Sequence, residues 1–94
     1  MPAVGLLTIE LRIPGTRSLK DKRRVLASVK DRLRKLNISL AETDYHDKQQ
    51  RTQLSIIAVA THRDGVDRSL SAALTEMERH YPDLILTTNI EWLN

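Results

Sequence analysis

The spacing of the apolar residues changes at Pro14-Gly15 from the period of a strand to the period of a helix. Before this point, apolar and polar residues alternate from Leu7 to Ile13, which indicates a strand over residues 4–13 with one buried face. After it, a single stripe of apolar residues at helical spacing extends from Leu19 to Leu36. We therefore expect the chain to begin with a strand and a helix that packs against a sheet.

The remaining elements follow the same two periods. Ser18, with Asp21 three positions later, predicts the start of the first helix as a capping box, and Asn37 predicts its end. We expect four further elements: a strand over 38–45, a strand over 52–61 after the polar stretch 46–51, a helix that Asp64 caps and Tyr81-Pro82 ends, and a strand over 84–93 with Leu84, Leu86, Ile90 and Trp92 on one side.

This order of elements, βαββαβ, predicts an α+β fold of the ferredoxin-like type, with a four-stranded antiparallel sheet and two helices on one face. The 94 residues allow one domain, residues 1–94, and leave no room for a second. The first helix starts where the first strand ends. We therefore expect residues 17–24, the hairpin 46–51 and the turn 79–81 to gather at one end of the domain.

The absence of cysteine excludes a disulfide scaffold, a thiolate zinc site and a cysteine nucleophile. Glu10 and Arg12 interrupt the apolar N-terminal stretch, so we expect no signal peptide. No apolar run approaches the roughly 20 residues that cross a bilayer. These features predict a cytoplasmic protein that does not associate with membranes.

The charge is distributed unevenly along the chain. Residues 1–36 hold ten Lys and Arg against three acids, a net charge of +7, whereas residues 37–94 hold five against nine, a net charge of −4. One interpretation is a solvated basic helix with the acids elsewhere by chance. The other is a one-sided positive field that attracts nucleic acid or another acidic surface.

The predicted first helix carries its cations on its solvent side. A basic helix face of this kind can follow phosphates, and each phosphate contact increases the salt dependence of binding. The alternative is a solubilising face with internal ion pairs, for example between Asp31 and Lys35. The face consists of Lys20, Arg23, Arg24, Arg34 and Lys35, together with Ala27 and Asp31.

Lys22 differs from these residues because it falls at the centre of the apolar stripe. It is either a lysine at the rim of the sheet whose ammonium reaches water, or an anion ligand beside the free amides of the helix N-terminus. The two alternatives stay open at this point. The predicted nucleic-acid or anion-binding residues are Arg17, Lys20, Lys22, Arg23 and Arg24, with Arg51 from the hairpin.

Glu42, Asp44 and Asp47 form an acidic run that leads into this hairpin. Residues two apart on a strand face the same way, so Glu42 and Asp44 could share a cation. The alternative, which we favour, is a set of surface ion pairs with the basic residues nearby. We find no histidine spacing typical of zinc, no glycine-rich phosphate loop and no catalytic triad. We therefore expect neither a metal nor a cofactor, and no enzymatic activity.

The chain has three aromatic residues, Tyr45, Tyr81 and Trp92, and none is expected in the middle of the sheet. RNA-binding domains of this fold stack bases on aromatic residues of the open sheet face. Here that face is predicted to be partly apolar and unable to stack bases, which suits a homodimer formed through the sheet face or edge. Its predicted residues are Thr8, Glu10, Gln53, Ser55, Ile57 and Val59.

Two motifs resemble the YlxP-like family of small bacterial proteins, a domain of unknown function. The first is the segment from Arg17 to Arg24, in which Ser18, Leu19, Lys20, Lys22 and Arg23 match; the second comprises Glu42, Asp44, Asp47, Gln50 and Arg51. The resemblance implies a ferredoxin-like fold. It also implies a link to ribosomes or RNA, because genes of the family in some bacteria lie beside those for translation and transcription factors. No catalytic residues are implied.

Residues and resemblance together favour a non-enzymatic RNA- or ribosome-associated module that contacts phosphates through its basic first helix. Without a stacking surface, such a module would recognise shape or backbone with weak sequence preference. One alternative is a homodimeric interaction module that binds an acidic protein. Another is a protein that binds a small ligand, such as a phosphorylated metabolite, at the basic end.

Overall fold

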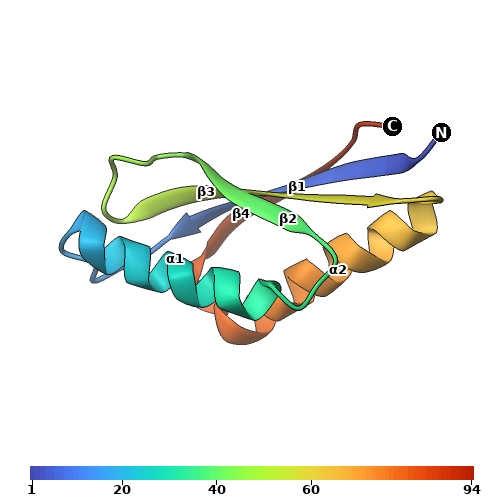
Figure 1. Ribbon diagram of the computed structural model, residues 1–94. Helices are drawn as coiled ribbons and strands as arrows, with labels where there is room; N and C mark the ends of the chain where they lie inside the picture. Colours follow the sequence, from blue (N-terminus) through green and yellow to red (C-terminus); the bar gives the residue numbers. More distant parts are fainter.

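The computed structural model describes all 94 residues and has the predicted order βαββαβ (Figure 1). The two ends of the chain lie side by side, where Val4 N–H donates to the Asn94 carbonyl. The elements are β1 (Ala3–Arg12), α1 (Leu19–Leu33), β2 (Ser39–Asp44), β3 (Arg51–Ala60), α2 (Arg63–His80), a short 3-10 turn η1 (Pro82–Leu84) and β4 (Ile85–Trp92).

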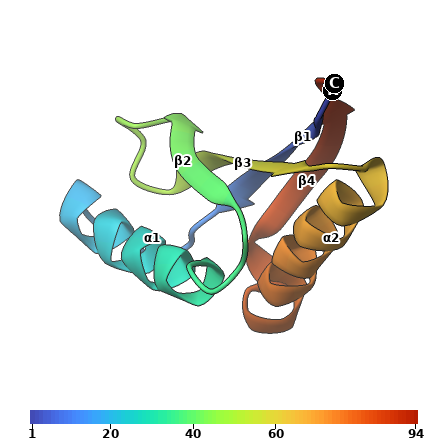
Figure 2. The ribbon, with the colours of Figure 1, turned by 45° about the vertical axis from the view of Figure 1, so that its right-hand side comes forward.

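The four strands form one antiparallel sheet in the order β2-β3-β1-β4. β1 and β3 pair over their full lengths, from Ala3 opposite Ala60 to Arg12 opposite Arg51. Both helices cover the same face of this sheet and diverge from one another, and the other face is open (Figure 2). The predicted ferredoxin-like architecture is confirmed.

One hydrophobic core of 15 buried residues lies between the sheet and the helices. The alternating residues of β1 and the apolar stripes of both helices enter it, as their spacing predicts. No helix of the structure is both long and apolar enough to span a membrane. The central contributors are Leu7, Ile9 and Leu11 from β1, Leu26, Val29 and Leu33 from α1, and Val66, Leu70, Ala73 and Met77 from α2.

The start of α1 is capped as predicted, and the start of α2 is not. Ser18 Oγ accepts from Asp21 N–H at 3.1 Å, and the Asp21 carboxylate accepts from Arg17 N–H at 3.1 Å. In α2 the cap position is His62, which makes no side-chain cap bond, and Asp64 lies in the first turn. The expectation for Asp64 is wrong by two residues, although its charge still favours that end of the helix.

The predicted alternation of β4 fails near its start. Glu10 pairs with Thr87 but Leu11 pairs with Ile85, so Leu86 is an extra residue in a β-bulge. Trp92 and Ile90 lie opposite Gly5 and Leu7 on the core side, as expected, although Ile90 is 43% exposed on this edge strand. Leu84 packs against the core from η1, whereas Leu86 at the bulge is 47% exposed. The bulge exchanges the inward and outward positions only for the residues before Thr87, and a strict period of two cannot anticipate this shift.

The expected gathering of three segments at one end is partly wrong. The start of α1 and the β2–β3 hairpin do meet, through a bond from Lys22 to the Tyr45 carbonyl. The end of α2 lies instead beside the second half of α1, where Tyr81 Oη is 3.0 Å from Ser28 Oγ and 3.1 Å from Arg32 Nε. Residues 13–18 carry the chain past the end of β1, so the first half of α1 extends beyond α2 (Figure 1).

Candidate functional site

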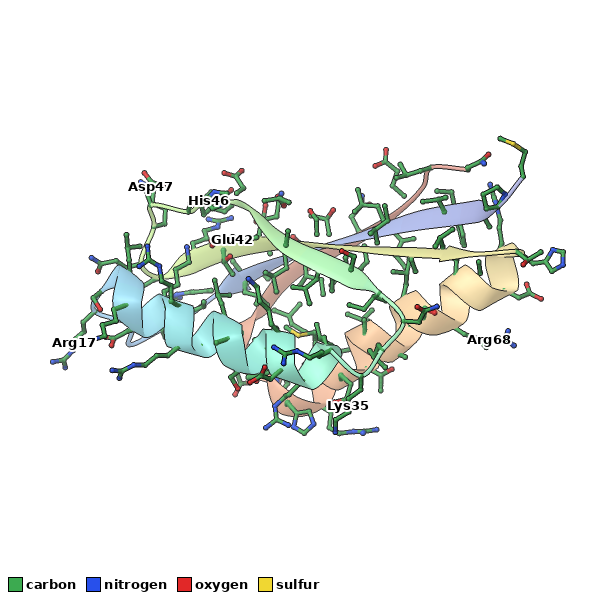
Figure 3. All side chains as sticks on the ribbon, viewed as in Figure 1. Arg17, Lys35, Glu42, His46, Asp47 and Arg68 are labelled. Carbon is green, nitrogen blue, oxygen red and sulfur yellow. The ribbon has the colours of Figure 1, made fainter.

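The first half of α1 and the residue before its cap present four exposed cations, Arg17, Lys20, Arg23 and Arg24. We call these four residues the basic face. Their spacing places Lys20, Arg23 and Arg24 on one side of the helix, with Arg17 just before its cap. None of the four side chains has a carboxylate within 4.0 Å, although acids are present elsewhere on the helix. Arg17 projects from the end of the molecule (Figure 3).

The second half of α1 is partly neutralised. Asp31 pairs with Arg34 at 2.9 Å and not with Lys35, the partner named for the solubilising alternative, while Arg32 donates to Tyr81 Oη. Both members of the Asp31–Arg34 pair are highly exposed, so the pair contributes little to stability. Lys30, Arg32 and Lys35 have no carboxylate within 4.0 Å either, so unpaired positive charge continues along α1 beyond the basic face.

Lys22 is buried beneath the basic face, with 2% of its side chain exposed. Its ammonium lies 2.8 Å from Glu42 Oε2 and donates to the Tyr45 carbonyl at 2.5 Å. The alternative of a rim residue with its ammonium in water is therefore wrong, because α1 and the hairpin enclose the group. Since the ammonium is already engaged inside the protein, we leave Lys22 out of the basic face.

Glu42 is the buried partner of Lys22, and the sequence pattern did not identify this pair. It also accepts from the Thr52 hydroxyl at 2.6 Å. Burial alone would raise the pKa of Glu42, but the hydrogen bonds from Lys22 and Thr52 and the positive charge of Lys22 outweigh burial and lower that pKa. The Glu42 carboxylate therefore stays ionised at neutral pH, and its contact with Lys22 ties α1 to β2.

This lowered pKa predicts a stability that depends on pH. A glutamate in the unfolded chain titrates near pH 4.3. Because the folded pKa is lower, the contribution of Glu42 is complete above about pH 5.5, and it is lost as the pH falls through the folded pKa. We expect Glu42→Gln to be less stable at pH 7 but to lose less stability than the parent between pH 6 and pH 3.5. Urea unfolding at both pH values measures this. Equal losses in both proteins would contradict it.

The loop before α1 is also attached to the hairpin, through a residue that the sequence analysis missed. Thr16 is buried, and its hydroxyl lies within hydrogen-bond distance of the carbonyls of Ile13 and Gln49. The Gln50 side-chain amide donates to the Thr16 carbonyl at 3.2 Å. The signal available in the sequence was a threonine in the predicted loop before the helix, since such residues often bond to nearby backbone.

Arg51 lies on the open face of the sheet, away from the basic face. It pairs with Glu10 at 2.7 Å and its guanidinium lies 4.9 Å from the centre of the Tyr45 ring. The bond to Glu10 raises the pKa of Arg51 further above its already high ordinary value. The six predicted binding residues thus occupy three environments: four on the exposed helix, Lys22 beneath it, and Arg51 on the sheet.

The acidic run is divided between the two faces. Glu42 lies opposite Leu54, toward the helices, but a bulge places Asp44 opposite Gln53, a residue of the open face. The Asp44 carboxylate accepts from Tyr45 N–H at 2.7 Å. No three His, Asp or Glu side chains are placed to hold a metal ion. The expectation that Glu42 and Asp44 face the same way is wrong because of this bulge.

The open face has the composition that alternation predicts. Thr8 lies opposite Ser55 and Glu10 opposite Gln53, with Ile57 and Val59 further along β3. Ile57 and Val59 are exposed, and no aromatic side chain occupies the central part of these strands. This part of the sheet has no surface for stacking bases.

Element order, sheet order and the one-sided helices define a ferredoxin-like α+β protein. Within this class, the chain belongs to the family of proteins of unknown function DUF503, whose model matches residues 4–90. It is 34% identical over 91 residues to the uncharacterized protein YlxP of Bacillus subtilis, which covers 95% of this chain and 98% of that relative.

Solved structures of other proteins share the fold. The designed protein Foldit4 superposes with a TM-score of 0.63 at 7% identity, over 100% of this chain and 98% of that one. SnoaB, a cofactor-independent oxygenase of Streptomyces nogalater, gives 0.58 at 13% identity (97% and 91% covered), and PA3566 of Pseudomonas aeruginosa gives 0.56 at 17% (99% and 93% covered). At these identities the likeness concerns the fold alone.

Proposed function

We propose that the protein is a non-enzymatic RNA-binding module that acts on ribosomes or their RNA, and that the basic face contacts the phosphates. The observation that carries this proposal is that all four cations of the basic face are exposed and lack a carboxylate partner, at the end of α1 that extends beyond α2. Exposed arginines and lysines without carboxylate partners are free to replace the counterions of a phosphate backbone.

Two further features support this assignment. The basic face lies where α1 extends beyond α2, so a polyanion can approach it without meeting the second helix (Figure 1). The buried Lys22–Glu42 pair and Thr16 hold this end of the helix against the hairpin, so that little ordering is required when the partner binds. Because the contacts are to phosphates, recognition depends weakly on sequence.

A charge reversal tests the proposal. The triple variant with Lys20, Arg23 and Arg24 each changed to Glu should bind RNA at least about 100-fold more weakly, because three phosphate contacts become repulsions. Its thermal stability should be nearly unchanged, because the three side chains are exposed and unpaired. Fluorescence anisotropy with ribosomal RNA over a salt series, and sedimentation with ribosomal subunits, provide the measurements.

Neutral replacement provides the quantitative control. Changing the same three residues to Gln should reduce the slope of log K against log salt by about 2 for a single strand. A matched variant, Arg63→Glu with Arg68→Glu at the far end of α2, should leave binding within about twofold if the basic face is the site. A triple Glu variant that binds RNA as tightly as the parent would show that the basic face is not the site.

A second candidate function is a homodimeric interaction module that recognises an acidic protein. Two exposed apolar residues of β3, Ile57 and Val59, together with Val4 and Ile38, line a shallow groove of about 300 Å³ at one end of the sheet. Sedimentation of the pure protein distinguishes the candidates. A tight dimer without affinity for RNA favours the interaction module, whereas RNA binding that the triple Glu variant loses favours the first proposal.

A further inference from the structure

We propose that a depression at the hairpin end of the open face binds a nucleoside phosphate, either a free nucleotide or an unpaired nucleotide of an RNA strand. The depression has a volume of about 620 Å³, within the range of small-molecule sites. It is formed by Arg12 at the end of β1, by the hairpin residues Tyr45, Asp47, Lys48, Gln49 and Gln50, by Arg51 at the start of β3 and by Leu86 at the bulge of β4.

The charge of the depression suits a phosphate. Arg12 and Lys48 are exposed and make no ion pair or side-chain hydrogen bond within the protein. Arg51 is the third cation, and its partner Glu10 leaves 47% of the arginine side chain exposed. Asp47 is the one carboxylate in the lining (Figure 3). Because the lining has two unpaired cations and only one acid, it favours an anion of low charge, such as a phosphate ester.

The depression also has a surface on which a planar ring can stack. The Arg51 guanidinium lies over the Tyr45 ring at 4.9 Å, and both groups contribute to the lining. Leu86, which the β-bulge turns outward, provides an apolar wall. Bases stack on tyrosine rings and on guanidinium planes in proteins that bind single strands. The middle of the open face lacks such a surface, so stacking is confined to this end.

The buried ion pair holds this surface in place. Tyr45 has a positive φ of 62°, a conformation that is uncommon for a residue other than glycine. Its carbonyl accepts from the Lys22 ammonium and from Lys48 N–H at 3.0 Å, and its N–H donates to the Asp44 carboxylate. Residues kept in such conformations by surrounding contacts cluster at ligand sites. The function of Lys22 in this arrangement is to position Tyr45 and not to touch the ligand.

The depression and the basic face lie on different sides of the same end of the domain, and the loop before α1 connects them. Thr16, which precedes Arg17, contacts Gln49 and Gln50 of the hairpin, and both glutamines line the depression. A strand that follows the basic face can thus place one unpaired nucleotide in the depression. Binding of an RNA nucleotide in the depression rests on the proposed function, whereas binding of a free nucleotide does not depend on it.

Titration with adenosine monophosphate tests the free nucleotide. We expect saturable chemical-shift changes at Arg12, Tyr45, Lys48 and Arg51. Adenosine, which lacks the phosphate, and inorganic phosphate, which lacks the ring, should each bind about tenfold more weakly than adenosine monophosphate. Equal binding of adenosine monophosphate and inorganic phosphate would refute the stacking role. The absence of any saturable shift at these residues would overturn the site for free nucleotides.

Substitutions of the exposed residues Arg12 and Lys48, and of the half-buried Tyr45, test the position of the site. Arg12→Gln combined with Lys48→Gln should weaken adenosine monophosphate binding about tenfold, since two charge contacts are lost. Tyr45→Asn removes the ring but keeps a residue that tolerates positive φ, and it should weaken adenosine monophosphate binding severalfold. Arg68→Gln, on α2 at the opposite end of the molecule (Figure 3), is the matched control and should have no effect. Unchanged binding by the double variant would refute the site.

Binding of an RNA nucleotide is tested by comparing the affinity of the protein for one RNA stem-loop with and without a single-stranded tail. If the depression takes an unpaired nucleotide, the tail should strengthen binding about fivefold. The double Arg12 and Lys48 variant should lose this gain and retain binding of the blunt stem-loop. The triple Glu variant of the basic face should lose both. If the tail has no effect, the depression does not bind an unpaired nucleotide of RNA, and only that part of the proposal is overturned. If the triple Glu variant keeps both its affinity for RNA and its affinity for adenosine monophosphate, the proposed function is overturned and the nucleotide site in the depression stands.

Discussion

Replacing Lys22 by methionine is expected to lower the free energy of unfolding by about 3 kcal/mol, since it leaves the charge of Glu42 buried without its partner. Methionine keeps the volume of the lysine stem, so the loss of packing is small. Glu42 retains the Thr52 hydroxyl and 16% side-chain exposure, which keeps the loss at the lower end of the range for broken buried pairs. In a domain of this size, 3 kcal/mol corresponds to a decrease of about 15 °C in Tm.

A double-mutant cycle separates the ion pair from the packing. Combining Lys22→Met with Glu42→Leu should recover most of the lost stability, since an apolar pair replaces two buried charges. Adding Thr52→Val, which removes the hydroxyl left without its acceptor, should recover more. Lys20→Met, on the exposed side of the same helix, is the matched control and should change stability by less than about 0.5 kcal/mol. A loss below about 1 kcal/mol for Lys22→Met would contradict this account of the pair.

Gly5→Val is expected to destabilise the fold by about 3 kcal/mol, although valine is favoured in strands. A Cβ atom at position 5 would lie 2.7 Å from Val66 Cγ1 and 3.0 Å from Leu70 Cδ1, both in the buried stripe of α2. The helix would have to move away from β1, and the core contacts around it would be lost. Urea unfolding of the single variant measures the effect.

The cause of this loss can be tested by removing the atom that clashes. Val66→Ala alone leaves a small cavity and should cost about 1–2 kcal/mol. The combination of Gly5→Ala with Val66→Ala should be more stable than the sum of the two single changes predicts, because the added Cβ atom occupies space that the removal of the Val66 methyl groups leaves empty. Strict additivity would mean that the close approach of α2 to β1 does not set the requirement for glycine.

The elements that sequence analysis predicted well are those governed by local physics. The period of the apolar residues identified both α-helices and all four strands, because burying one face imposes that period on a chain that packs against a core. The Ser18 cap was predictable for a similar reason, since its bond to Asp21 N–H closes within one helical turn. The exposed positions of the cations of α1 followed from the same helical period.

Apart from the cap of α2, which was misplaced by two residues, the errors arose where one element depends on another that is distant in the sequence. The bulge that exposes Leu86 is defined by pairing with Glu10 and Leu11, and the bulge that separates Glu42 from Asp44 is defined by pairing with β3. The end of α2 was misplaced because the chain between β1 and α1 carries that helix beyond its neighbour. The composition of one segment alone does not contain this information.

The sequence by itself thus determined the order of elements, the helix cap, the faces that enter the core and the positive charge of α1, because these depend on residues a few positions apart. Only the tertiary structure decided what Lys22 does. Its place in an apolar stripe marked it as unusual, but whether its ammonium reaches water or a carboxylate depends on β2, which follows 17 residues later and folds over it. The same contact holds Tyr45 beside Arg51, so the stacking surface exists only once the hairpin and the helix meet.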